Sequence, residues 1–218
     1  MMPFIIKHYA DKKIDKLVRE TSKQLCRFFG VEWKDNQPQI FVVPDRKTVD
    51  HLKGYPTPDW LSGWTEGMEV FLLDPKEAFA HLPPEQREQS FQQIVRHELC
   101  HAFFFRITGS FRPLWLNEGL AVYLSKQGSP GGKANKFSAL FREGPLNAEY
   151  YQQAETSVSL LMRRFGKRKM LKLIKSIPQG SGHGFRQEFK SIFGSDPAEK
   201  FFSTLQSNTG LKRERAKR

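Results

Sequence analysis

Cysteine is scarce in this chain of 218 residues, in which only Cys26 and Cys100 occur. Two cysteines cannot build the disulfide framework on which small secreted domains depend. The hydrophobic content of 39% and the charged content of 27% are instead typical of a globular protein long enough to bury a sizeable core. With 19 phenylalanines in the chain, we expect that core to be rich in aromatic rings.

Long apolar runs are also missing. No window approaches the length of a membrane-spanning helix. The first ten residues lack the apolar stretch of a signal peptide, since charge begins at Lys7. We therefore expect a cytoplasmic protein without a transmembrane segment, although a secreted protein trimmed of its export signal would look the same.

Acidic residues are missing from one long window and rare at the C-terminus. Residues 162–175 carry seven basic residues and no acid, and residues 211–218 carry five basic residues and one acid. Together they supply +11 of the net charge of +12. Such segments can attract nucleic acid, an anionic membrane or an acidic partner. We favour the plainer interpretation, a solvated helix face and a disordered tail.

One pentapeptide carries chemistry, His97-Glu98-Leu99-Cys100-His101. Residues i and i+4 of a helix lie on one face, so both imidazoles can bind a single metal ion. Neutral imidazole suits zinc, and Glu98 lies where it can take a proton from a zinc-bound water. Cys100 faces away from the two histidines, which favours a core position over a ligand role.

The surroundings of the pentapeptide are too apolar for a solvated helix. It is flanked by Phe91, Ile94, Val95, Ala102, Phe103, Phe104 and Phe105. Burying two histidines and a glutamate there is costly unless they are paired or bind a metal. Segment 115–121, Trp-Leu-Asn-Glu-Gly-Leu-Ala, offers Glu118 as a third ligand on a second buried helix. The alternative is a core histidine pair, with Glu118 as an acid at the start of its helix.

The pentapeptide followed by Asn-Glu-Gly-x-Ala at 117–121 resembles the gluzincin metallopeptidases, above all their short peptidase MA-like members. The likeness covers roughly residues 60–205. It implies that His97, His101 and Glu118 bind Zn²⁺ and that Glu98 is the general base. The protein would then be a zinc-dependent metallopeptidase that hydrolyses peptide or protein substrates through a Glu-activated, zinc-bound water.

The same resemblance suggests further residues around the zinc. It implies that the strand at 68–73 is the sheet edge on which an extended peptide pairs. Peptide hydrolysis also needs a donor for the oxyanion. Tyr151-Gln-Gln-Ala154 resembles the Tyr-x-x-Gly/Ala helix that supplies the catalytic tyrosine of gluzincin aminopeptidases, with alanine where glycine is usual. This implies Tyr151 as the donor.

Alternatives to Tyr151 remain open at this point. Tyr150 and His183 are the other candidates for the oxyanion donor, and both tyrosines could instead be core aromatics. Asn117 would either hydrogen-bond near the zinc or cap the second helix.

The periodicity of the chain predicts an α+β protein. Helical spacing of apolar residues indicates a helix over 11–29, and short apolar runs at 40–43, 60–64 and 68–73 indicate strands. A helical turn is expected at 45–53, and the metal-binding helix should run from about Pro83 to Thr108. Everything beyond it reads as helical, with segments at 113–126, 133–141, 149–165, 167–177, 184–193 and 197–205.

Three parts follow from these elements. Residues 1–109 should form an α/β subdomain with a mixed sheet, which ends in the metal-binding helix. Residues 110–207 should form an all-helical subdomain, with the active-site cleft between the two. Residues 208–218 should be a flexible basic tail. The sequence leaves the oligomeric state open.

Two other functions fit parts of the pattern. A DNA-associated metalloprotease of the SprT-like kind has the same pentapeptide and would explain the basic segments, but its third ligand is typically a histidine. A non-catalytic module that keeps zinc for stability and binds acidic partners would have no need of Glu98 as a base.

Overall fold

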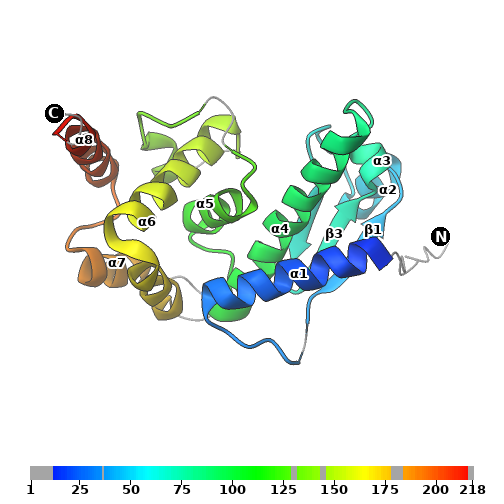
Figure 1. The fold of residues 1–218 in the computed structure, drawn as a ribbon, viewed down its shortest axis with the longest axis horizontal. Helices are drawn as coiled ribbons and strands as arrows, with labels where there is room; N and C mark the ends of the chain where they lie inside the picture. The colour runs from blue at the N-terminus through cyan, green and yellow to red at the C-terminus, as the bar shows by residue number, and fades with distance from the viewer. Residues whose placement is uncertain (1–11, 36, 129–131, 143–145, 178–183, 216–218) are drawn as a thin grey trace. The chain divides into compact units, whose positions relative to one another are not determined.

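The computed structural model describes residues 12–35, 37–128, 132–142, 146–177 and 184–215, the last seven by their backbone alone. Over these residues the fold is α+β, with eight α-helices, one 3-10 helix and one three-stranded mixed sheet (Figure 1). None of the described helices combines the length and apolar character needed to span a bilayer. The chain forms two compact units, residues 1–106 and 107–218.

The first unit contains the sheet. Its helices are α1 (Lys12–Phe29), α2 (Arg46–Lys53), α3 (Pro75–Ala78) and α4 (Pro84–Thr108), which ends just inside the second unit. Its strands are β1 (Gln39–Val43), β2 (Gly63–Glu66) and β3 (Glu69–Leu73). These elements confirm the predicted helices and two of the strands. The strand predicted for 60–64 instead begins at Gly63, because Trp60 lies in an exposed turn.

Strand β3 lies in the centre of the sheet, whose order is β1-β3-β2. It pairs in parallel with β1 and antiparallel with β2. The expectation that the strand at 68–73 is the sheet edge is therefore wrong. Its run Val-Phe-Leu-Leu is buried throughout, as a central position requires, whereas the equally long apolar run of β1 is only partly buried. The edge next to α4 belongs to β2.

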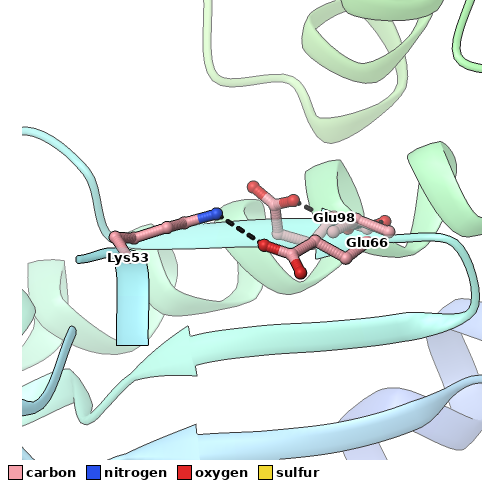
Figure 2. A network of polar contacts seen from close by, with 4 residues as sticks. Lys53, Glu66 and Glu98 are labelled. Atoms are coloured by element: carbon pink, nitrogen blue, oxygen red, sulfur yellow. Dashed lines mark hydrogen bonds and ion pairs between the residues drawn. The ribbon is translucent and has the colours of Figure 1, made fainter. Parts of the chain in front are cut away.

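One face of the sheet carries a ladder of aromatic rings. Phe71 stacks between Phe41 and Trp64, with ring centroids 5.0 and 4.7 Å apart. Lys53 of α2 places its ammonium 4.6 Å from the centre of the Trp64 ring. The same ammonium lies 2.7 Å from the carboxylate of Glu66 (Figure 2). These contacts fix β2 from the side that faces away from α4.

The other face of the sheet packs against α4. Strand side chains alternate, so Gly63 and Thr65 share this face. A methyl group placed on Gly63 would lie 2.9 Å from Cγ of Glu98 and 3.0 Å from Cγ2 of Ile94, which shows how closely strand and helix approach. Helix α1 also packs on α4, where the rings of Phe29 and Phe103 stack 5.6 Å apart.

Within the described residues, every regular element of the second unit is a helix. Its elements are α5 (Leu114–Ser125), the 3-10 helix η1 (Ser138–Phe141), α6 (Ala148–Ser176), α7 (Phe185–Phe193) and α8 (Glu199–Arg215). Gly166, with φ 78° and ψ 166°, interrupts α6 where the sequence predicts a break between two helices. The helix predicted for 133–141 is only the short η1. Helix α8 continues to Arg215, beyond the point where a flexible tail was expected to begin.

Aromatic side chains fill the core of this unit, which confirms the expectation drawn from the phenylalanine content. The ring of Phe202 lies 5.4 Å from Trp115, 5.5 Å from Phe137 and 6.3 Å from Phe189. Such pairs contribute about 0.5–1.5 kcal/mol each beyond the area they bury. Through Phe202 of α8 they connect α5, the residue before η1, and α7.

Helices α5 and α6 approach so closely that their backbones touch at Gly119. A Cβ atom placed there would lie only 2.4 Å from the carbonyl oxygen of Ala154. Any larger residue at 119 would push the helices apart. This contact gives a physical reason for glycine directly after Glu118 in the Asn-Glu-Gly pattern.

Candidate metal centre

Helix α4 presents His97 and His101 one turn apart. Their ring centroids are 4.7 Å apart and their planes meet at 83°, so two neighbouring imidazoles are available on one side of the helix. His101 is buried, with 7% of its surface exposed, and His97 is half-buried. The helix geometry predicted from the i, i+4 spacing is therefore present.

Glu118 lies on α5 and is 9% exposed. It is the fifth residue of the helix, and no acidic residue lies in the first turn. The alternative in which Glu118 is an acid at the helix start therefore does not fit. Asn117 is the fourth residue of the helix, and Pro113 occupies the N-cap, so the proposed capping role of Asn117 is wrong. Its side chain is 2% exposed.

These three side chains form one group. One ligand atom from each of His97, His101 and Glu118 lies within 4.8 Å of the other two. Tetrahedral zinc with bonds of about 2.1 Å separates neighbouring ligand atoms by about 3.4 Å. Binding of zinc would bring the three ligand atoms closer together than the 4.8 Å within which they lie. Two imidazoles and one carboxylate form a donor set that fits zinc and leaves a fourth position open.

Glu98 is the most buried carboxylate of the region, with 5% of its surface exposed. The hydroxyl of Thr65 lies 2.8 Å from its Oε2 atom and 3.0 Å from its main-chain oxygen. The side chain is thus held in place from the edge strand. The sequence gives no sign of this contact, because 33 residues separate Thr65 from Glu98 and no motif links them.

The two tyrosines at the start of α6 have different surroundings. Tyr150 is 8% exposed, and its pKa is raised, first by burial and then by the negative charge of Glu118, while Arg112 opposes the shift. Its hydroxyl therefore stays protonated and can donate a hydrogen bond. Tyr151 is half-buried, and its ring meets that of Tyr150 edge-on at 6.3 Å. The structure thus relates Tyr150 to Glu118 electrostatically, whereas the sequence favours Tyr151.

Two further residues were considered from the sequence, Cys100 and His183. Cys100 is fully buried, does not belong to the three-residue group, and forms no disulfide with Cys26. His183 falls outside the described residues.

Comparison with known proteins does not add to the site. No protein-family model matches the chain, and a search of curated proteins finds no match either. The likeness to gluzincins therefore rests on the sequence motifs, and the site on its donor chemistry and geometry.

The metal centre predicts how zinc content responds to substitution. We expect about one zinc per chain in the wild type, most of it lost in His101→Ala and Glu118→Ala because each removes one of three ligands. Glu98→Gln should keep its zinc, since Glu98 is not a ligand. Elemental analysis of the purified proteins measures this. Full zinc in Glu118→Ala would show that the third ligand is a different residue.

Proposed function

We propose that this protein is a zinc-dependent metallopeptidase. The observation that supports it best is the grouping of His97, His101 and Glu118 within 4.8 Å of one another, directly beside the buried carboxylate of Glu98. A purely structural metal site needs no neighbouring base. Burying a carboxylate that does not bind the metal costs free energy, and a module that keeps zinc only for stability would gain nothing from it.

The roles of the side chains follow from their chemistry. Zinc bound by the three ligands would supply Lewis acidity that polarises a scissile carbonyl and makes water more acidic. Glu98 accepts a proton from the attacking water and delivers it to the leaving amine. A tyrosine hydroxyl donates a hydrogen bond to the oxyanion that develops on the former carbonyl oxygen.

A peptide library tests the proposed activity. Incubation with the wild type should produce cleaved peptides, which mass spectrometry identifies together with the bonds that were broken. Glu98→Gln should retain zinc and lose cleavage, because an amide cannot take up the proton of water at neutral pH. Cleavage that persists unchanged in zinc-loaded Glu98→Gln, or a zinc-loaded wild type that cleaves nothing, would refute the proposal.

Parallel Tyr→Phe substitutions at positions 150 and 151 show which tyrosine is the oxyanion donor. The family resemblance implies Tyr151 as the oxyanion donor. Tyr151→Phe should therefore lower kcat by about 10²- to 10³-fold, the usual cost of losing one oxyanion donor. KM should change little, because the bond forms mainly in the transition state. Tyr150→Phe is the matched control at the neighbouring position. If it carries the rate loss while Tyr151→Phe is fully active, the donor is Tyr150.

We also propose a second candidate function, action on proteins bound to nucleic acid, on the strength of one surface. All seven basic residues of α6 between residues 162 and 175 are exposed, namely Arg163, Arg164, Lys167, Arg168, Lys169, Lys172 and Lys175. Arg168, Lys172 and Lys175 follow helical spacing and form a stripe about 10 Å long. Among the described residues, the exposed large apolar side chains all lie outside α6, which disfavours insertion into a membrane.

This surface predicts binding of duplex DNA that weakens steeply with salt, through release of counterions. Replacing Arg168, Lys172 and Lys175 by glutamate should lower the affinity and reduce the slope of log K against log salt by about 2–3. The same change at Lys12, Lys16 and Lys23, three exposed lysines of α1, is the control of equal charge. Removing residues 211–218 should weaken binding further. No binding by the wild type at low salt would leave a solvated helix face.

A further inference from the structure

Two residues of the edge strand form a niche for the carboxylate of Glu98. Gly63 and Thr65 lie two positions apart on β2 and therefore face α4 together. The Thr65 hydroxyl is 2.8 Å from Oε2 of Glu98. The bare backbone of Gly63 leaves room for the Cγ atom of Glu98.

The Thr65 hydroxyl has one proton and two acceptors within reach, both on Glu98. The main-chain oxygen at 3.0 Å belongs to a helix, in which it already accepts a backbone N–H, whereas Oε2 at 2.8 Å carries negative charge when Glu98 is ionised. Hydrogen bonds to ionised groups are roughly twice as strong as neutral ones. The hydroxyl therefore donates to Oε2, and this leaves Oε1 to accept the proton of water.

Gly63 is needed because the niche has no spare volume. A Cβ atom at this position would meet Cγ of Glu98 at 2.9 Å on one side and the carbonyl oxygen of Phe71 at 3.1 Å on another. Since Phe71 belongs to the central strand, the added methyl group could not retreat into the sheet. It would displace the Glu98 side chain instead.

The strand that carries these residues is fixed from several directions. Gly63 pairs with Leu72 and Thr65 with Val70, and both partners are fully buried. Trp64, between them, stacks on Phe71 at 4.7 Å. A side chain on such an element can hold its partner to within the fraction of an ångström that proton transfer demands.

We propose that Thr65 is a positioning residue for Glu98, and that Gly63 provides the space in which Thr65 holds it. The proposal deepens the proposed function and rests on it, because it takes Glu98 to be the base. Thr65 itself does not touch substrate. It acts by keeping one carboxylate oxygen occupied and the other one directed at water.

Kinetics of three threonine variants test the proposal. Thr65→Val keeps the shape and removes the hydroxyl, so kcat should fall about 10- to 100-fold, as is usual when an outer hydrogen-bond partner is lost, with KM and zinc content unchanged. Thr65→Ser restores the hydroxyl and should recover most of kcat. Thr57→Val is the matched control, because Thr57 also donates to a carboxylate, that of Asp50, at 2.6 Å. It should leave kcat unchanged.

A second measurement does not depend on activity. Thermal unfolding of Thr65→Val, Glu98→Ala and the double variant forms a double-mutant cycle, whose shifts should be non-additive if the two side chains interact directly. Thr57→Val combined with Glu98→Ala should be additive. The cycle remains informative even if the wild type cleaves no peptide, which would refute the proposed function alone.

Gly63→Ala tests the space rather than the hydrogen bond. It should lower kcat while Thr65 and the zinc content stay intact, because the methyl group displaces Glu98. The proposal is overturned if Thr65→Val retains the kcat of an active wild type, or if the cycle shows additive shifts. It is also overturned if Thr65→Ser is as impaired as Thr65→Val, since the loss would then arise from packing.

Discussion

Burial of polar groups among apolar side chains is the constraint on which this structure depends. Glu98, His101 and Glu118 each expose less than a tenth of their surface, and α4 around the first two is lined by fully buried Leu99, Ala102 and Phe103. Removing a carboxylate or imidazole from water costs several kcal/mol unless hydrogen bonds or a metal replace the water. The buried positions of these three residues carry this free-energy cost, and contacts from neighbouring elements offset it.

The offset comes from elements whose positions are fixed by ordinary packing. Edge strand β2 supplies Thr65 to Glu98. The strand is itself held by the aromatic ladder and by the ion pair between Lys53 and Glu66 (Figure 2). In the second unit, the close approach of α5 and α6 at Gly119 fixes the helix turn that carries Glu118. Rigid elements that carry a few polar groups are the arrangement in which a catalytic geometry can be maintained.

Much of this could be predicted from the sequence because the signals are local. Helical spacing placed His97 and His101 on one face, the apolar flanks indicated burial, and Gly166 marked the break in α6. The α+β class followed from the same patterns. Glu118 was a candidate third ligand because it is the carboxylate on the second buried helix, and the resemblance to gluzincins implies the same role. Its grouping with the two histidines agrees with that expectation.

What was missed depends on pairing between distant segments. Strand order cannot be deduced from the apolar run of β3, and the edge role was assigned to the wrong strand for that reason. Thr65 has no local signal, since its importance comes from the register of β2 against β3 and the depth at which α4 packs. Tyr150 and Tyr151 are adjacent in sequence. Only the tertiary structure shows that burial and the negative charge of Glu118 raise the pKa of Tyr150. The cap role given to Asn117 is wrong because Asn117 lies inside the helix, whose N-cap is Pro113.

The most direct test of the metal centre is X-ray diffraction from crystals of the zinc-loaded protein, measured on both sides of the zinc absorption edge. One anomalous peak should lie about 2.0–2.2 Å from a nitrogen of His97, a nitrogen of His101 and a carboxylate oxygen of Glu118. Oε2 of Glu98 should remain on Thr65 and away from the metal. A peak ligated by Glu98, or one from which Glu118 is missing, would contradict the assignment of base and ligand on which the proposed function depends.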